Sequence, residues 1–370
     1  MKICCIANPN SVHTHRRVKY FYERGHDVYL IGEHKPVIDP PSGATIYNLS
    51  DITNTRKYRY LRWGLEARRI VRRLQPDILH TLGAVSAGWL GYMTGFHPFS
   101  ITAMGSDINL LQKRSSLFQR FTKSTLRNAD YILCVSNDLF DKVLAYGGSP
   151  DKCEVVYLGI DLDTFHPGAN KAKIRRELSL EPGPTILCIR AMNWLYNPLD
   201  IAKAVPLVLQ HVPQARFVVF TYNKDKEVFS QFKNIIKQNN STYGVSYVGA
   251  LNDDSRLANY YRASDLAISV PSSDGTPISV LECMACGTPV ILSDLPSLHD
   301  WAKDEKDSLF VPVGDVPAIG KAIIRLLSDK IMLEKLGHNA SNAMKNRADH
   351  KIWMKRIEQI YYQLAGNVSP

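Results

Sequence analysis

Several features that would assign the chain to a common class are missing from its 370 residues. No low-complexity tract occurs, and no G-x-G-x-x-G fingerprint is present, which weighs against a dinucleotide-dependent oxidoreductase. The chain opens Met-Lys-Ile-Cys-Cys-Ile-Ala, which is typical of a first β-strand and not of a signal peptide. We therefore expect a cytoplasmic protein.

Cysteine is sparse, with seven residues, an odd number. Without a leader segment, this count favours reduced thiols over a disulfide framework. Cys283 and Cys286 form a C-x-x-C inside a predicted helix, and no second pair completes four ligands. We expect these cysteines to pack in the core, and we expect no metal ion and no other cofactor.

Charged residues are absent from residues 78–106. A stretch of that length raises the question of a membrane span. Several glycines and Pro98 interrupt it, however. The better interpretation is a strand at 78–82, a buried helix at 85–95 and a strand at 99–103.

Composition and charge set broad limits on the fold and on the partners. Apolar residues make up 45% of the chain, and its length suits two domains of about 150–200 residues. The formal charge is +10, and both halves of the chain are mildly basic. This balance favours anionic partners, but it does not indicate nucleic acid specifically.

Short apolar runs alternate twice with amphipathic segments, as in doubly wound α/β domains. The first series predicts strands at 2–7, 27–31, 78–82, 99–103, 131–135 and 153–157. The second predicts strands at 185–189, 215–220, 245–248, 266–270, 289–292 and 308–311. A final amphipathic helix is expected at 352–364.

Residues 270–292 carry the most specific pattern of the chain, a strand end followed by a glycine loop and a short helix. Thr276 is a suitable N-cap for this helix, and Pro277 is a suitable first residue. The start of such a helix presents unpaired backbone N–H groups, which suit a phosphate. Glu282 lies about 7–8 Å further along the axis, at roughly 1.5 Å per residue, so a ribose could meet its carboxylate.

This segment resembles the acid-x7-acid signature of glycosyltransferase family 4, a group of retaining enzymes with the GT-B fold. Asp274 and Glu282 are the two acids, and Met-Ala-Cys-Gly-Thr-Pro-Val at 284–290 continues the match. The family usually has Glu at the first acidic position. Residues 157–167 resemble the hinge between the two domains of that family, and Gly-His-Asp-Val at 25–28 resembles the turn after its first helix.

The resemblance implies an α/β protein of the GT-B type, with two Rossmann-like, doubly wound domains that face a central cleft. We expect an acceptor-side domain at residues 1–165 and a nucleotide-sugar-binding domain at 166–350. A C-terminal helix within residues 351–370 is expected to cross back to the first domain.

Arg190 follows a predicted strand, at a position where the family has an arginine that grips the donor diphosphate. The planar guanidinium fork can meet two phosphate oxygens. The lysine that usually follows is missing, and Tyr196 and Asn197 stand nearby. The resemblance assigns catalytic roles to Arg190, Asp274 and Asp107, although Asp107 could equally cap a helix. It assigns donor binding to Gly275, Thr276, Pro277, Ile278, Ser279, Glu282, Gly249 and Asn197.

Three histidines are candidates on the acceptor side. His13 and His15 lie in the loop after the first strand, where open α/β sheets place ligands. His80 ends another predicted strand, and a structural role in the core is its alternative. Met104 stands where the family commonly has a histidine, so no role is carried over to that position.

The resemblance implies a retaining glycosyltransferase that moves a hexose from a nucleoside-diphosphate sugar, taken here as a UDP-sugar, to a hydroxyl acceptor. The product would be a glycan, a glycolipid or a small-molecule glycoside. Two alternatives stay open. The first is a catalytically silent GT-B subunit that binds nucleotide, which the aspartate at 274, the missing lysine and Met104 would suit. The second is a sugar-nucleotide epimerase.

Two basic segments bear on a membrane partner. One runs from Arg56 to Arg73 and the other from Lys113 to Arg127, each with apolar residues at helical spacing. Such helices can dock on anionic lipid, which would place the protein at the inner face of the cell membrane. Solvated helix faces on a basic protein are the alternative.

Overall fold

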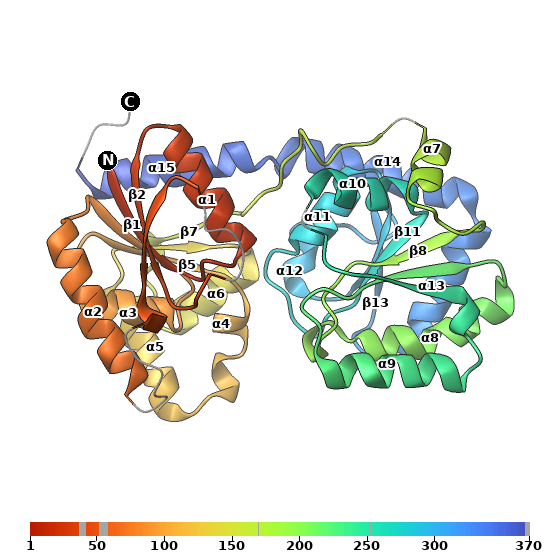
Figure 1. The fold of residues 1–370 in the computed structure, drawn as a ribbon, viewed down its shortest axis with the longest axis horizontal. Coiled ribbons are helices and arrows are strands. Elements are labelled where there is room, and N and C mark those ends of the chain that lie inside the picture. Colours follow the sequence, from red (N-terminus) through yellow and green to blue (C-terminus); the bar gives the residue numbers. More distant parts are fainter. Residues whose placement is uncertain (37–41, 52–57, 169, 252, 367–370) are drawn as a thin grey trace. The chain divides into compact units, whose positions relative to one another are not determined.

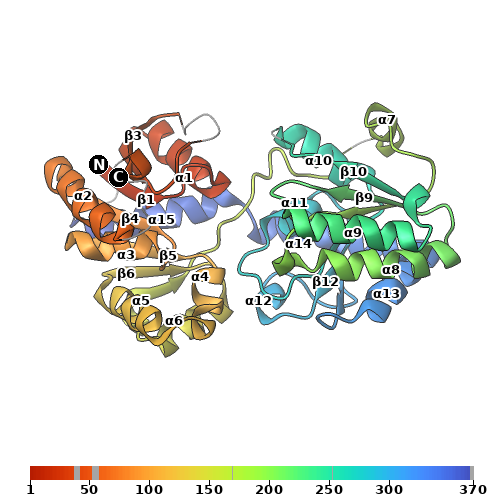
Figure 2. The same cartoon turned by 60° about the horizontal axis from the view of Figure 1, so that its bottom comes forward.

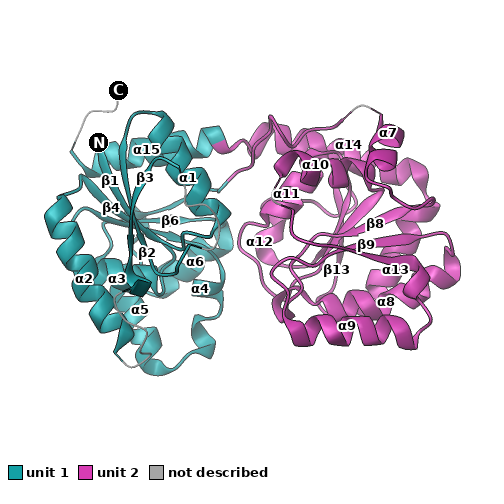
Figure 3. Ribbon diagram, viewed as in Figure 1, with its two compact units in different colours: residues 1–158, 351–370 teal, residues 159–350 magenta. Residues whose placement is uncertain are grey.

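The computed structural model describes residues 1–36, 42–51, 58–168, 170–251 and 253–366. The chain forms two compact units, coloured separately in Figure 3. Unit 1 comprises Met1–Leu158 and Lys351–Pro370, and unit 2 comprises Gly159–His350. Each unit has one parallel sheet covered by helices on both faces, which confirms the predicted α/β architecture with two doubly wound domains (Figure 1).

Unit 1 contains a seven-stranded sheet with the order β3-β2-β1-β4-β5-β6-β7, in which all paired strands are parallel. Its strands are β1 (Lys2–Ala7), β2 (Asp27–Gly32), β3 (Ala44–Asn48), β4 (Ile78–Leu82), β5 (Phe99–Ala103), β6 (Tyr131–Cys134) and β7 (Cys153–Val155). Its larger helices are α1 (Val12–Glu23), α2 (Arg59–Leu74), α3 (Ala87–Thr94), α5 (Ser116–Asn128), α6 (Asn137–Ala145) and α15 (His350–Leu364). A single turn, α4 (Ser106–Asn109), follows β5.

Side chains along each strand of unit 1 alternate between two cores, because successive residues of a strand point to opposite faces. Cys4 and Ile6 of β1 face α2, α3, α5 and α6, whereas Ile3 and Cys5 face α1 and α15. The unpredicted strand β3 is an edge strand that pairs with β2. Its Ala-Thr-Ile-Tyr-Asn sequence is only half-buried and has no continuous apolar run, so the pattern of hydrophobicity did not mark it.

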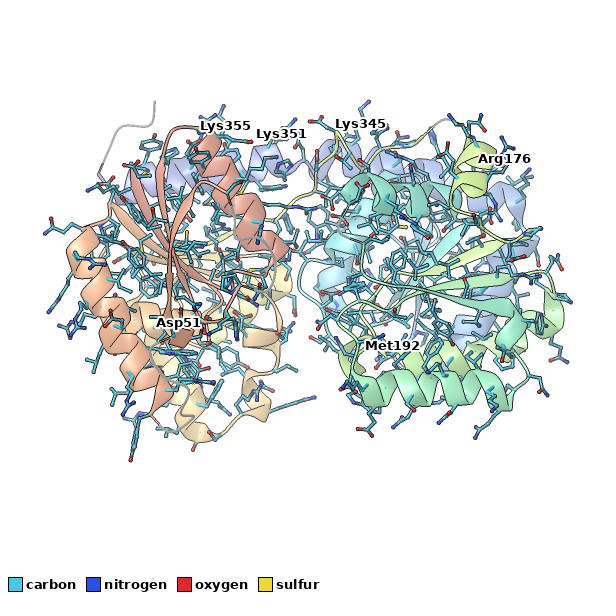
Figure 4. The ribbon with its side chains drawn as sticks, in the orientation of Figure 1. Asp51, Arg176, Met192, Lys345, Lys351 and Lys355 are labelled. Atoms are coloured by element: carbon cyan, nitrogen blue, oxygen red, sulfur yellow. The ribbon has the colours of Figure 1, made fainter. Side chains whose placement is uncertain are left out.

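The C-terminal helix α15 packs on unit 1 through buried Met354, Ile357, Ile360 and Tyr361. The carboxylate of Glu358, almost fully buried, accepts hydrogen bonds from Arg24 Nε and His26 Nε2, each at 2.8 Å. Arg356 donates two further bonds to Glu154, at 2.7 and 2.6 Å. Lys351 and Lys355 lie on the exposed side of the helix (Figure 4).

Unit 2 contains a six-stranded parallel sheet with the order β10-β9-β8-β11-β12-β13. Its strands are β8 (Thr185–Cys188), β9 (Arg216–Phe220), β10 (Val245–Val248), β11 (Leu266–Ser269), β12 (Val290–Ser293) and β13 (Ser308–Val311). Figure 2 shows α8 (Pro198–His211), α9 (Lys226–Gln238) and α13 (Val316–Ser328) on one face. The other face carries α10 (Asp254–Ala263), α11 (Ile278–Ala285) and α14 (Lys330–Arg347). Two short helices, α7 (Lys171–Glu177) and α12 (Pro296–His299), complete the unit.

The expected domain boundary at residue 165 differs from the observed one, which follows Leu158. The segment after Gly159 belongs to unit 2 because it is bonded there. Ile160 N–H donates to the Ala348 carbonyl at 2.7 Å, and Arg262 donates to the Thr164 carbonyl at 2.6 Å. Phe165 is fully buried beside Tyr261.

The described residues contain no helix that is both long and apolar enough to cross a membrane. The uncharged stretch at 78–106 instead forms β4, α3 and β5, as predicted.

Candidate functional site

The strands of unit 2 are parallel, so the residues that follow them gather at one edge of the sheet. Because β9, β8 and β11 are neighbours, three segments meet there: Tyr222 after β9, Arg190 after β8, and the loop at 270–277 after β11. That loop leads into α11. The sheet topology therefore brings together residues that are far apart in the sequence.

Arg190 lies at the centre of this group and contacts three side chains. Its Nη2 lies 2.9 Å from Oδ2 of Asp274, and both side chains are 10% exposed. Its Nη1 donates to the Ser279 hydroxyl at 3.3 Å, at the start of α11. The Arg190 guanidinium also lies over the ring of Tyr196, 4.2 Å from the centroid. These three contacts orient the guanidinium toward Asp274 and the start of α11.

The electrostatics of the cluster keep Arg190 charged. Burial acts to lower the pKa of Arg190, but Asp274 and then Tyr196 and Tyr222 outweigh it and raise that pKa. Burial also raises the pKa of Tyr222, with smaller contributions from Tyr196 and Glu282. The site thus presents a permanent cation beside the neutral hydroxyl of Tyr222, an arrangement suited to an anionic ligand.

Tyr222 was not among the predicted site residues. Its hydroxyl donates to the Ile189 carbonyl at 3.3 Å, and the charges of Arg190 and Glu282 act on its pKa in opposite directions. The available signal was positional, because Tyr222 follows a predicted strand in the same way as Arg190.

The start of α11 differs from the prediction by one residue. The helix begins at Ile278 with Pro277 at the N-cap position, so Thr276 is not the cap and Pro277 is not the first helical residue. The proline ring has no side-chain acceptor for a helix N–H group. Gly287, at φ +83°, follows the end of the helix.

Glu282 projects from α11 into the interior and is 4% exposed. Burial raises the pKa of Tyr222 and of Tyr261, and the Glu282 carboxyl adds to both rises. The backbone of the loop before α11 is held at Asp274, because the Ser297 hydroxyl donates to the Asp274 carbonyl at 2.9 Å. The two acids of the predicted signature thus flank the start of α11.

The other donor-side candidates lie around this centre. Gly275 N–H donates to Asp274 Oδ1 at 2.9 Å. Gly249 follows β10, and a Cβ atom added there would meet nothing within 4 Å. Asn197 joins its own loop to the loop after β11, because its side-chain amide donates to the Val270 carbonyl at 3.0 Å and accepts from the Ser272 hydroxyl at 2.9 Å. The structure thus gives Asn197 a positioning role and places Tyr196 against Arg190.

Asp107 in unit 1 does not cap its helix through the usual geometry, because Gly105 occupies the N-cap position of α4. Its carboxylate instead accepts backbone N–H bonds from two loops, from Ala84 at 2.8 Å and from Gly105 at 2.8 Å. Burial raises the pKa of Asp107, and these bonds oppose the rise. Asp107 therefore holds together the loops that follow β4 and β5.

The three candidate histidines occupy different environments. His80 is fully buried, and its ring contacts the guanidinium of Arg17 and the hydroxyls of Ser100 and Thr102. Burial, and then the charge of Arg17, lower the pKa of His80, so its ring is neutral. This environment fits the alternative given for His80, a structural role in the core.

The other two histidines lie near the end of β1. His15 is partly buried, and its Nε2 donates to the Pro9 carbonyl at 2.8 Å. His13 is also partly buried, and burial followed by Arg16 and Arg17 lowers its pKa to about 4. Both side chains lie at the edge of unit 1 where β1 ends, and their acceptor-side roles stay predictions.

Metal-binding side chains do not cluster in the part of the chain that the structure describes, where no group of three or more His, Cys, Asp or Glu could hold an ion. The Asp-x-Asp at 161–163 forms a local turn, because Asp161 accepts from Asp163 N–H at 3.0 Å and from the Thr164 hydroxyl at 2.8 Å. Cys283 and Cys286 are buried thiols.

Two protein families match the chain in sequence. The family described as "Glycosyl transferases group 1" matches residues 170–343, and the one described as "Glycosyl transferase 4-like" matches residues 2–136. Together they span well over half of the chain. The protein therefore belongs to the group 1 glycosyltransferases, which confirms the predicted family and its enzymatic class.

Relatives and solved structures agree with this assignment. The chain is 24% identical over 320 residues to the UDP-Gal:alpha-D-GlcNAc-diphosphoundecaprenol alpha-1,3-galactosyltransferase of Escherichia coli, covering 81% of this chain and 78% of that enzyme. The chain spans about half the length of the D-inositol 3-phosphate glycosyltransferases that it also matches.

Two solved structures share the fold. The sucrose-phosphate synthase of Thermosynechococcus elongatus superposes with a TM-score of 0.87 at 19% identity, covering 99% of both chains. The HepE protein of Anabaena in complex with UDP-glucose superposes with a TM-score of 0.84 at 14% identity, covering 98% of this chain and all of that one. At these identities the likeness establishes the GT-B fold alone.

Proposed function

We propose that this glycosyltransferase uses a UDP-sugar, which binds at the sheet edge of unit 2. The observation that supports it best is the Arg190 cluster, a buried cation beside the start of α11 with Glu282 one to two turns further on. The E. coli relative is named for a UDP-Gal donor, and the Anabaena structure holds UDP-glucose. Both names support uracil as the base of the donor nucleotide.

In this proposal Arg190 and the α11 start bind the diphosphate and stabilise its negative charge as it leaves. Glu282 accepts hydrogen bonds from the ribose hydroxyls, and Asp274 accepts them from the donor sugar. Tyr196 supports the guanidinium through its ring face. Catalysis then depends on positioning and on charge stabilisation, and it needs no metal ion.

The reaction proceeds with retention of the anomeric configuration. An acceptor hydroxyl forms a bond to the anomeric carbon while the bond from that carbon to the diphosphate oxygen breaks. The acceptor proton passes to the departing phosphate oxygen on the same face of the sugar. Arg190 offsets the charge that develops on the diphosphate, so its removal should affect the chemical step directly.

For the acceptor we propose a hydroxyl carried by a lipid at an anionic membrane surface. The E. coli relative is named for a diphosphoundecaprenol substrate, and a relative from Streptococcus pneumoniae is named alpha-monoglucosyldiacylglycerol synthase. Helices α2 and α5 of unit 1 expose basic side chains together with large apolar ones, Leu61, Leu65 and Leu117. Arg56 lies outside the described residues, so this surface is defined by α2 and by Lys113 to Arg127.

The test is turnover. Purified protein is mixed with UDP-glucose, UDP-galactose and other sugar nucleotides, each with lipid-linked and soluble acceptors, and release of nucleoside diphosphate is measured. We expect UDP release that requires both a lipid acceptor and Arg190, with Arg190→Ala lowering kcat by about a hundredfold or more, as for other charge-stabilising groups. Turnover with GDP- or ADP-sugars alone would overturn the donor assignment.

A further inference from the structure

The guanidinium that should bind the diphosphate is already paired with a carboxylate. Arg190 Nη2 and Asp274 Oδ2 are 2.9 Å apart, and both side chains are nine-tenths buried. A carboxylate at this distance balances the charge that the guanidinium would otherwise offer to phosphate oxygens. A diphosphate that reaches Arg190 must therefore compete with Asp274.

The two partners are not equally able to change position. Asp274 is fixed by its neighbours, since its Oδ1 accepts from Gly275 N–H at 2.9 Å and its carbonyl accepts from the Ser297 hydroxyl at 2.9 Å. Arg190 has a long side chain, and its second contact, to Ser279 Oγ, is a weaker bond at 3.3 Å. The guanidinium can turn toward the start of α11, while Asp274 stays in place.

We propose that Asp274 holds Arg190 in the donor-free site, and that the donor replaces this ion pair with one contact to each of the two side chains. The diphosphate takes Arg190, and hydroxyls of the donor sugar take the carboxylate of Asp274. This inference rests on the proposed function, because it assigns the order of contacts at the proposed donor site.

The exchange makes affinity depend on the sugar. An intact donor supplies partners for both Arg190 and Asp274. UDP alone supplies one for Arg190, and it leaves a buried carboxylate beside a bound anion without its cation, which is costly. The ion pair thus weakens binding of the UDP product relative to the donor, and it favours product release after each turnover.

Removal of a residue from a binding site usually weakens binding, whereas here we predict that a change of Asp274 strengthens the binding of UDP. Asp274→Asn keeps the shape of the side chain but removes its charge, so Arg190 becomes available to phosphate. We expect UDP to bind Asp274→Asn about five- to twentyfold more tightly than the wild type. UDP-glucose should gain less or lose affinity, so the preference for donor over UDP falls.

The experiment is isothermal titration calorimetry of the full chain with UDP and with UDP-glucose. Glu334→Gln is the matched control, because it removes one negative charge from an exposed position on α14 and should leave both affinities unchanged. Asp274→Ser is the second variant, used if Asp274→Asn does not fold, and it should also tighten UDP. The UDP titration does not depend on which sugar the enzyme transfers.

The outcomes separate the two claims. Weaker or unchanged UDP binding by Asp274→Asn would overturn the ion-pair exchange and leave the UDP-sugar proposal in place. A wild type that binds no UDP would overturn the proposed donor, and this inference with it. Both claims are supported only if the wild type binds UDP and Asp274→Asn or Asp274→Ser binds it more tightly.

Discussion

The guanidinium of Arg190 lies 4.2 Å from the ring centroid of Tyr196, in the segment where the family usually has a second cation. The chain therefore has an aromatic face beside its arginine in place of a lysine. An aromatic ring over a guanidinium stabilises the cation and restricts its orientation. We interpret Tyr196 as a support for Arg190, the side chain that we propose binds the diphosphate.

Removal of the ring should therefore weaken catalysis without unfolding the protein. Tyr196→Leu is expected to lower kcat/KM for the donor by about five- to thirtyfold, equivalent to about 1–2 kcal/mol of lost cation–π interaction. Tyr196→Phe keeps the ring and should stay close to the wild type. Tyr243→Leu removes an exposed tyrosine of the same unit and serves as the control. If Tyr196→Leu and Tyr196→Phe lowered kcat/KM equally, the aromatic ring would not be what supports Arg190.

Turnover should not depend on a divalent cation, because Arg190 and the α11 start supply the charge stabilisation that a metal gives in other transferases. The check is the initial rate of UDP release in EDTA, compared with the rate in Mg²⁺ or Mn²⁺. We expect equal rates. Activity that is lost in EDTA and restored by either ion would show that the arginine and the helix start are insufficient.

The bond network of Glu358 predicts a pH-dependent contribution to stability. Burial alone would raise the pKa of Glu358, but the hydrogen bonds from Arg24 and His26 outweigh it and lower the pKa in the folded protein. A carboxyl with a lowered pKa stabilises the fold above its unfolded pKa of about 4.3, and this contribution is lost as the pH falls through the folded value. Glu358→Gln should therefore destabilise unit 1 at pH 7 by about 2 kcal/mol.

Thermal unfolding at pH 7 and at about pH 3 tests this sign. The gap between the midpoints of the wild type and Glu358→Gln should shrink at the lower pH, because the wild-type carboxyl takes up a proton as the pH falls toward its folded pKa. Glu334→Gln, an exposed substitution, should give no gap at either pH. A gap that stays constant would mean that the charge of Glu358 is not what holds α15.

The basic surface of α2 predicts salt-sensitive binding to anionic vesicles. Replacing Arg69, Arg72 and Arg73, all exposed, by Gln should reduce sedimentation with phosphatidylglycerol vesicles, by about 1 kcal/mol for each charge removed. Lys226, Lys233 and Lys237 of α9, changed to Gln together, remove the same charge from unit 2 and should have little effect. Absence of vesicle binding by the wild type at low salt would argue for simple solvated helix faces.

Apolar runs predicted most of the fold, because buried parallel strands are continuous in hydrophobicity. Strands β1, β4, β5, β10 and β13 have the predicted bounds. β3 was missed because its sequence, Ala-Thr-Ile-Tyr-Asn, contains no continuous apolar run. The start of α11 was misplaced by one residue, since Thr276 and Pro277 are both acceptable near a helix start and only the backbone decides between them.

The candidate site was predictable in part. Arg190, Asp274 and Glu282 stand in recognisable motifs, but the ion pair between Arg190 and Asp274 joins two loops whose approach depends on strand order. The same holds for Tyr222, which lies in no motif and enters the site because β9 is the neighbour of β8. For His80 the sequence position suggested a site residue, since this histidine ends a predicted strand. In the structure its ring contacts the hydroxyls of Ser100 and Thr102 in the core.

The central claim is that unit 2 binds a uridine nucleotide at the Arg190 and Glu282 edge. Its most direct test is the thermal shift of the wild type with UDP, GDP, ADP, CDP and dTDP, repeated with Glu282→Ala. We expect UDP at about 100 times its dissociation constant to add roughly 2.7 kcal/mol of stability to the wild type and much less to the variant. No stabilisation of the wild type by UDP, or an equal response from Glu282→Ala, would contradict the account.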